Sequence, residues 1–180
     1  MFLKGTLKKF FDILLSENVS EEINNNKEYF LEVVRVLKDA IGFDQNHPHH
    51  HLDLWDHIMM VLDNTEPDLE LRLAALFHDV GKPFSFVIGK DNYKHYPFHA
   101  FVSMKIAKNF LWKYNFDEEL TNNVLYLILN HDTAIDLEKI EDRELEIKRL
   151  KLQYADALAH HPDTIQKRIK HLDQIKKVLI

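Results

Sequence analysis

The spacing of apolar residues is the feature that most narrows the fold of this 180-residue chain. Near the N-terminus, Leu7, Phe10, Phe11 and Leu14 recur at the i, i+3, i+4, i+7 spacing of one helix face. The same period returns in several later segments, and only 4 glycines and 5 prolines interrupt the whole chain. We therefore predict an all-α fold of about seven to nine helices.

The later segments predict where the remaining helices lie. Helical periods are found near residues 29–40, 54–62, 69–80, 98–114, 117–131 and 138–160, and Pro162 fits the first turn of a last helix. Gly81 stands where a helix C-terminal glycine is expected and leaves room beside the helix end. Residues 82–96 are irregular, and the alternation of Phe84, Phe86 and Ile88 allows one short hairpin near 84–96.

The chain shows no internal repeat, low-complexity segment or linker, so we expect one domain over residues 1–180. Within it, we predict N-terminal helices over 1–45, a core that carries the functional site over 46–160, and a C-terminal helix over 161–180. Neither a long apolar run nor a signal peptide is visible, so we expect a cytoplasmic protein without a membrane partner. The oligomeric state is not indicated by the sequence.

Charge and cysteine content exclude some classes of function. Lysine plus arginine is 23 and aspartate plus glutamate is 29, which gives a net charge of −6. This balance argues against an extended nucleic-acid surface, although a small nucleotide stays possible because a bound metal can supply positive charge. The absence of cysteine excludes disulfides and thiolate metal sites. The 12 histidines are the unusual feature, since histidine is the commonest metal ligand among side chains.

His78 and Asp79 are the first candidate site residues. They follow the apolar residues Leu76 and Phe77, where two polar groups are costly unless something satisfies them. A divalent cation would do so with one nitrogen and one oxygen ligand. The alternative is an ordinary solvated helix end.

Four more residues could belong to the same site. His57 lies at the edge of an apolar helix face, Asp156 lies among small and apolar residues, and His99 and His131 lie at expected helix ends. Each has a simpler explanation when taken alone. The histidines could be core residues or could interact with a helix dipole, and Asp156 could form a buried salt bridge.

Taken together, these motifs resemble the HD-domain superfamily of metal-dependent phosphohydrolases. The order His57, His78-Asp79, Asp156 is similar to its H…HD…D pattern. The sequence is closer to the HD module of bacterial CCA-adding tRNA nucleotidyltransferases, which the segments 50–57, 78–83, 95–99 and 155–156 resemble. The likeness covers roughly residues 40–160.

The sequence also departs from those enzymes. Their nucleotidyl-transferring head is absent, so we do not expect CCA-adding activity. Ala100 follows His99 where the family often has glutamate, so a supporting carboxylate is not expected there. Gly81-Lys82 replaces the acidic pair of the alarmone hydrolases in the superfamily.

The resemblance implies a metal site formed by His57, His78, Asp79, His99, His131 and Asp156, with Asp79 bridging if two metals bind. Nitrogen and oxygen ligands suit one or two divalent transition metals, such as Mn, Fe, Co, Ni or Zn. The implied reaction is phosphomonoester or phosphodiester hydrolysis of a nucleotide or other small phosphate, with metal-activated hydroxide as nucleophile. We expect Asp79 and Lys82 to be catalytic, and Lys82 and His50 to bind substrate.

Two other functions stay open. Some members of the superfamily are di-iron oxygenases, which use six ligands of this kind. A non-catalytic nucleotide-sensing module is the third possibility, although the complete ligand set counts against it.

Overall fold

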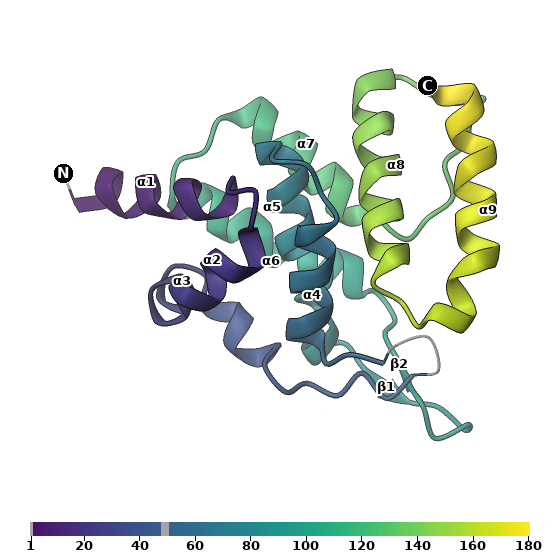
Figure 1. The fold of residues 1–180 in the computed structure, drawn as a ribbon, viewed down its shortest axis with the longest axis horizontal. Helices are drawn as coiled ribbons and strands as arrows, with labels where there is room; N and C mark the ends of the chain where they lie inside the picture. The colour runs from purple at the N-terminus through teal and green to yellow at the C-terminus, as the bar shows by residue number, and fades with distance from the viewer. Residues whose placement is uncertain (1, 48–50) are drawn as a thin grey trace.

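The computed structural model describes residues 2–47 and 51–180, and within them it contains nine α-helices and one two-stranded sheet (Figure 1). The elements, in chain order, are α1 (Phe2–Leu14), α2 (Val19–Asn25), α3 (Lys27–Val33), the 3₁₀ helix η1 (Arg35–Asp39), α4 (Leu54–Asp63), α5 (Leu69–Phe77), the 3₁₀ helix η2 (Lys82–Phe84), β1 (Val87–Ile88), β2 (Lys94–His95), α6 (His99–Lys113), α7 (Glu118–Leu129), α8 (Arg143–Leu158) and α9 (Pro162–Leu179). None of the helices in these ranges is long and apolar enough to cross a membrane.

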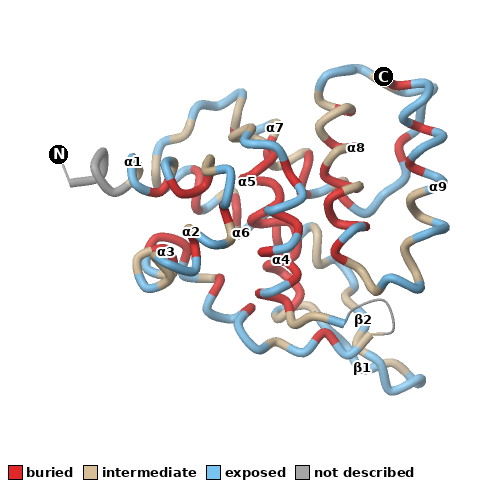
Figure 2. Tube along the Cα trace, in the orientation of Figure 1, coloured by how far each residue is buried: buried red, intermediate tan, exposed pale blue. Residues whose placement is uncertain are grey.

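Helices α4 and α5 form the centre of the molecule. Every residue from Leu71 to Lys82 is buried, and α4 buries seven of its ten residues, as the red stretches of Figure 2 show. The helix α5 packs against α4, α6, α7 and α8, so it is enclosed on all sides. An apolar helix of this kind is expected in the middle of a core.

Aspartate side chains begin four of the helices. Asp53, Asp68, Asp117 and Asp142 cap α4, α5, α7 and α8, and each accepts a hydrogen bond from a backbone N–H in the first turn. Such a cap satisfies a donor that has no partner inside the helix and contributes about 1 kcal/mol. These caps mark where four of the helices around the site begin, whereas α6, which carries His99, has no side-chain cap.

The N-terminal helices share the central core. Phe10 of α1 stacks on Phe30 of α3, with ring centroids 5.2 Å apart, and lies 5.7 Å from Phe110 of α6. The buried guanidinium of Arg72 on α5 donates to the carbonyls of Leu14 and Ser16 at the end of α1. The helices α1 and α3 are thus joined to the core, α1 by both apolar and polar contacts.

The helices α8 and α9 form a pair at the other side of the molecule, in green and yellow in Figure 1. A smaller apolar cluster between them contains Leu150, Leu172, Ile175 and Leu179. Only residues 159–161 separate the end of α8 from the beginning of α9. Helix α9 then runs back beside α8, which brings Arg168 to Asp156.

The all-α prediction and the hairpin are confirmed, but several boundaries were wrong. The helix predicted near 29–40 is divided into α3 and η1, and α2 was not predicted at all. The helix predicted over 138–160 begins only at Arg143. The helix predicted over 69–80 ends at Phe77, so Gly81 is not its C-terminal cap; Gly81 has a φ of −77°, which any residue adopts.

Candidate metal centre

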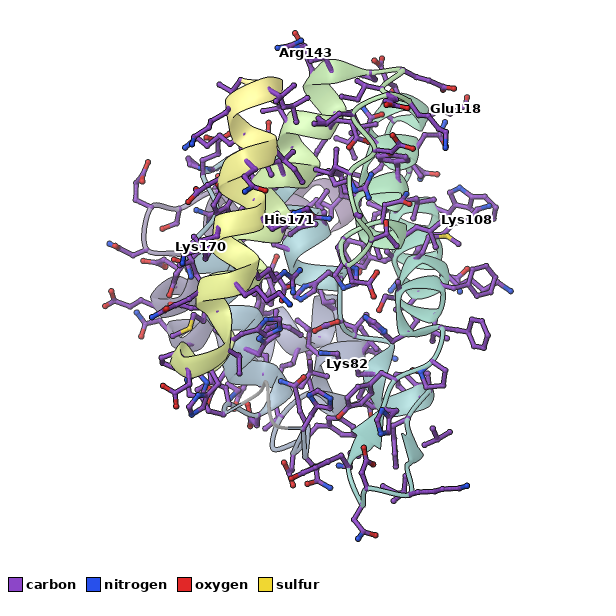
Figure 3. The ribbon with its side chains drawn as sticks, turned by 90° about the vertical axis from the view of Figure 1, so that its right-hand side faces the viewer. Lys82, Lys108, Glu118, Arg143, Lys170 and His171 are labelled. Atoms are coloured by element: carbon purple, nitrogen blue, oxygen red, sulfur yellow. The ribbon has the colours of Figure 1, made fainter. Side chains whose placement is uncertain are left out.

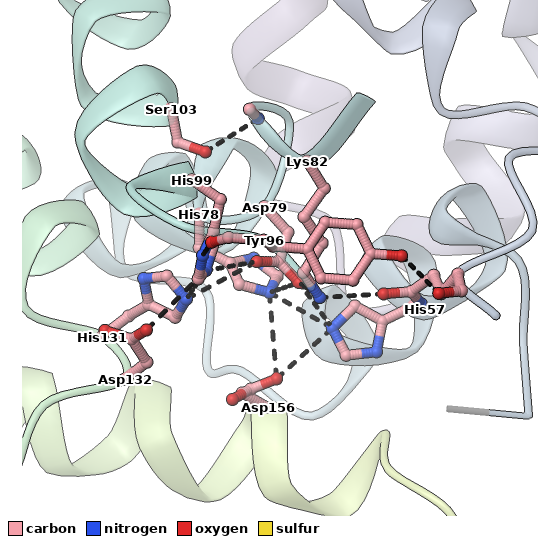
Figure 4. Close-up of polar contacts among 12 residues, drawn as sticks. His57, His78, Asp79, Lys82, Tyr96, His99, Ser103, His131, Asp132 and Asp156 are labelled. Atoms are coloured by element: carbon pink, nitrogen blue, oxygen red, sulfur yellow. Dashed lines mark hydrogen bonds and ion pairs between the residues drawn. The ribbon is translucent and has the colours of Figure 1, made fainter. Parts of the chain in front are cut away.

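Six polar side chains from separate parts of the chain converge beside the end of α5 (Figure 4). They are His57 on α4, His78 and Asp79 just after α5, His99 at the start of α6, His131 just after α7, and Asp156 on α8. Five of them are at most 4% exposed, which rules out the solvated helix end as an explanation of His78 and Asp79.

The first group of donors surrounds one oxygen of Asp79. His57 Nε2 lies 3.3 Å from Asp79 Oδ2 and 3.3 Å from Asp156 Oδ1. His78 Nε2 lies 3.2 Å from the same Asp79 oxygen and 3.2 Å from His57 Nε2. The ligand atoms of His57, His78 and Asp156 lie within 4.8 Å of one another, so this group could hold one ion.

The second group surrounds the other oxygen of Asp79. His99 Nε2 lies 3.3 Å from Asp79 Oδ1, and His131 Nε2 lies 3.5 Å from it. The two histidine nitrogens are 3.3 Å apart, and Asp132 Oδ2 approaches His99 Nε2 to 3.8 Å. The two oxygens of Asp79 therefore face two different groups of ligand atoms.

Backbone carbonyls fix the orientation of three of these histidines. His78 Nδ1 lies 2.8 Å from Ala75 O, His99 Nδ1 lies 2.9 Å from Tyr96 O, and His131 Nδ1 lies 2.7 Å from Ile128 O. A ring that donates from Nδ1 to a carbonyl has its Nε2 lone pair available for a metal, and metal-binding histidines are usually held in this way.

Burial and the neighbouring charges set the protonation of the site. Burial lowers the pKa of His78, which favours its neutral, metal-binding form. Burial alone would raise the pKa of Asp79, but Lys82 and His78 outweigh it and hold this pKa well below its ordinary value. The pKa of His57 is raised, because contacts with Asp156 and Asp79 outweigh the opposite effect of burial. Both carboxylates of the site are thus ionised at neutral pH.

Lys82 is a buried member of the site. Its ammonium lies 2.6 Å from Asp79 Oδ2 and donates to Gln45 Oε1 at 2.8 Å. The side chain is only 6% exposed, so Lys82 is not an ordinary surface lysine. Lys82 supplies a positive charge within reach of whatever occupies the centre.

Asp156 carries two kinds of contact at once. Its Oδ1 faces His57, and its Oδ2 lies 2.8 Å from Arg168 Nη2 on α9. The salt bridge that was the alternative explanation of Asp156 therefore exists beside the contact with the histidine. His160 lies 3.6 Å from Asp156 Oδ1, and burial lowers its pKa to about 4.

Gly81 is required by close packing. A Cβ atom there would lie 2.5 Å from His99 O and 2.8 Å from Ser103 Oγ, which is closer than real contacts allow. The Gly81 N–H donates to Ser103 Oγ at 2.8 Å. This close approach holds the start of α6, and with it His99, against the segment that carries Asp79.

A cavity of about 240 Å³ lies over the centre. Asp79, His99, His131 and Asp156 line it together with cationic and histidine side chains: Lys82, Lys94, Arg168, His47, His95 and His160. Three carboxylates line this space, those of Asp79, Asp156 and Asp132, so the nitrogen donors around it suit an anion only once a cation is bound.

Sequence reasoning missed several of these residues. His50 lies outside the described residues, so its predicted role stays a prediction. Gln45, Asp132, His160 and Arg168 were not predicted. Asp132 directly follows His131, and this adjacency was the available signal for it. His160 lies four positions after Asp156, which is the spacing of neighbours one helical turn apart. Nothing in the sequence pointed to Arg168 or Gln45.

The donor set fits one or two divalent metals. Buried Asp79 Oδ1 accepts no hydrogen bond from the side chains and backbone that the structure describes, although two histidine nitrogens face it. A buried carboxylate oxygen without a donor is costly, and a cation between these atoms would satisfy it. His57, His78 and Asp156 form one group that could hold an ion, and His78, Asp79 and His131 form another.

Comparison with known proteins agrees with this geometry. A family model described as HD domain matches residues 49–169, which contain all six donors. The CC-adding tRNA nucleotidyltransferase of Thermus thermophilus is 31% identical over 125 residues, which is 64% of this chain and 26% of that enzyme. The similarity thus involves about a quarter of the length of this relative.

Proposed function

Because the chain belongs to the HD domain family, a superfamily of metal-dependent phosphohydrolases, we propose that it hydrolyses a phosphomonoester or phosphodiester of a nucleotide or another small phosphate compound. We further propose His57, His78, Asp79, His99, His131 and Asp156 as the ligands of one or two divalent transition metals. Two bound metals would supply an activated water nucleophile and would neutralise phosphoryl oxygens.

The position of Asp79 is the observation that supports this proposal most strongly. Its two oxygens face two groups of ligand atoms, and the cavity above it is lined by Lys82, Lys94 and Arg168. A phosphate group entering this cavity would meet positive side chains on several sides. An oxygenase for an uncharged substrate would have no need of them.

Lys82 has a specific role in this scheme. In the protein it lies against Asp79 Oδ2, where it balances a carboxylate charge. A metal at that oxygen would repel the ammonium, which could then move towards a phosphoryl oxygen in the adjoining cavity. Lys82 would thereby stabilise the charge that develops on phosphate during hydrolysis.

Metal analysis together with a phosphatase panel tests the proposal. The protein is purified without chelators, its metal content is measured by mass spectrometry, and it is assayed with p-nitrophenyl phosphate, bis(p-nitrophenyl) phosphate and nucleotides. Asp79→Asn should lose both metal and activity. Asp39→Asn, at an exposed position at the end of η1, is the matched control and should keep both.

Lys82→Gln separates the substrate role from the metal role. We expect it to retain metal and to lose roughly 10²–10³-fold in turnover, which is typical for loss of one charge-stabilising donor. If metal-loaded wild-type protein hydrolyses no phosphate ester but consumes oxygen, the function is that of an oxygenase. Binding of nucleotides without any turnover would instead favour a sensing module.

A further inference from the structure

A line of aromatic and lysine side chains runs along the solvent side of α6. We call it the α6 stripe, and its members are Phe98, Phe101, Lys105, Lys108 and Trp112. Their spacings of three, four, three and four positions place them on one face of a helix. The opposite face of α6 is buried through Ser103, Ala107, Phe110 and Leu111.

The aromatic members of the stripe are unusually exposed. Phe98 is 81% exposed, Phe101 is 46% exposed and Trp112 is 61% exposed, although the solvent side of a helix is normally polar. Phe98 also has a φ of 60°, which is strained for a bulky residue. These side chains add little to the core, so the fold does not explain them.

The lysines of the stripe lie over its rings. Lys105 Nζ is 4.9 Å from the centre of the Phe101 ring, and Lys108 Nζ is 4.3 Å from the Trp112 ring. The sequence of α6 contains no aspartate or glutamate, in a chain whose net charge is −6. The next acidic residues along the chain are at positions 117–119, beyond the end of α6. Figure 3 shows Lys108 and Glu118 at the same edge of the molecule.

One end of the stripe adjoins the cavity along the chain, because Phe98 stands between Tyr96 and His99, which line it. Phe98 immediately precedes His99, whose Nε2 lies 3.3 Å from Asp79 Oδ1. From His99 to Trp112 the helix rises by about 20 Å, at 1.5 Å per residue. A ligand lying along the stripe could therefore extend over several monomer units and end at the cavity.

The net charge of the chain argues against an extended nucleic-acid surface, but α6 has no acidic residue, and we propose that the α6 stripe binds a single-stranded nucleic acid and presents its terminal phosphate to the metal centre. On binding, the two lysines would leave the ring faces over which they lie and contact the backbone phosphates, and bases would stack on the rings irrespective of sequence, which is the general pattern of single-strand binding. At the centre, water would add across the terminal P–O ester bond and give inorganic phosphate and a free hydroxyl. That cleavage step rests on the proposed function, whereas binding along α6 does not.

The charge pattern favours this ligand over two others. An anionic membrane would be attracted by a broad basic patch, whereas the stripe has only two lysines, and both lie against rings. In a symmetric dimer that used this face, the lysines of one copy would lie opposite the lysines of the other, and the like charges would repel each other. A flexible polyanion with aromatic bases matches both components of the stripe.

Fluorescence anisotropy with a labelled single-stranded RNA of about ten nucleotides tests the proposal. We expect Phe101→Ala/Trp112→Ala to weaken binding roughly tenfold or more. Val178→Ala, on the exposed side of α9 at 61% exposure, is the matched control and should bind as the wild type does. Phe98→Gly relieves the strained φ, so it should weaken binding while thermal stability stays equal or rises.

The lysines are tested by a salt series. Lys105→Gln/Lys108→Gln should make the slope of log K against log salt about 1.4 smaller, since each phosphate contact contributes about 0.7 on a single strand. Lys170→Gln/Lys177→Gln changes the net charge equally but lies on α9, and it should leave the slope unchanged.

The outcomes separate this inference from the proposed function. Hydrolysis of small phosphates without any binding of RNA overturns the inference and leaves the proposed function intact. RNA binding that depends on the stripe, with no hydrolysis of any phosphate, supports the inference and contradicts the proposed function. Binding to vesicles in place of RNA, or a dimer that Trp112→Ala dissociates, also overturns the inference.

Discussion

Replacing Arg149 by methionine should destabilise the protein by about 3–5 kcal/mol, the usual loss when one partner of a buried charge pair is removed. Arg149 lies on α8 and is 5% exposed. Its guanidinium donates to the carbonyls of Asn130 at 2.9 Å, Thr133 at 2.7 Å and Ala134 at 3.0 Å. It thereby holds residues 130–134, the loop that carries His131.

The expected magnitude follows from what the methionine would leave behind. Each charge-assisted hydrogen bond contributes about 1.5–3 kcal/mol, but the bonds share one side chain and their sum would overcount. Glu146, which lies 3.2 Å from Arg149 Nη1 and is 6% exposed, would become a buried carboxylate without its cation. Tyr126 would still donate a hydrogen bond to it. For a chain of this size the loss corresponds to a fall in Tm of about 6–20 °C.

Urea unfolding followed by circular dichroism measures this loss. The double variant Arg149→Met/Glu146→Gln should recover about 1–2 kcal/mol, because the unpaired buried charge is removed. Arg143→Met, an exposed position on the same helix, should change stability by less than about 0.5 kcal/mol. A loss below about 1 kcal/mol for Arg149→Met would refute the reasoning. Metal affinity should fall as well, because the loop positions His131.

Three further predictions concern the centre and its supports. His99→Ala and His131→Ala should each lower the metal content towards one per chain in mass spectrometry; unchanged metal content and turnover in both would show that the enzyme needs a single metal. Gly81→Ala should cost about 1–3 kcal/mol in unfolding experiments and also lower metal content, because its Cβ displaces His99; a neutral effect would contradict the close packing. Arg72→Met should cost about 3 kcal/mol without affecting the metal content of the folded protein, because its carbonyl partners lie at the end of α1 and before α5; a loss of metal would argue against separate roles.

The fold class was predictable because apolar periodicity determines helices, and the chain has few residues that interrupt it. The failures are local. The apolar residues Tyr29 to Ala40 continue at helical spacing, but the chain turns at Val34, which has a φ of −114°, and continues as a 3₁₀ helix. Packing of α3 against the core decides this turn, and periodicity in one segment does not contain that information.

The candidate site was predictable only as far as its residue types and order allowed. A histidine beside an aspartate after an apolar helix is expensive to bury, and this cost pointed to His78 and Asp79. Arg168 and Gln45 carry no comparable signal. An arginine on an amphipathic helix is normally solvated, and its contact with Asp156 depends on how α9 folds back on α8.

One local device orients three of the four site histidines, and it explains why helix ends supply them. His78, His99 and His131 each bond through Nδ1 to the carbonyl three residues earlier, at Ala75, Tyr96 and Ile128. Carbonyls in the last turn of a helix, or in a turn before one, lie outside the regular i to i+4 ladder, so they can accept from a side chain that follows, even where they also accept a nearby N–H as Tyr96 and Ile128 do. Inside a helix the same carbonyls are already bonded to backbone N–H groups. His57 lies inside α4, where its Nε2 faces the carboxylates of Asp79 and Asp156 and its ring stacks on that of His160. The order of histidines in the sequence therefore carries geometric information wherever a helix ends just before one of them.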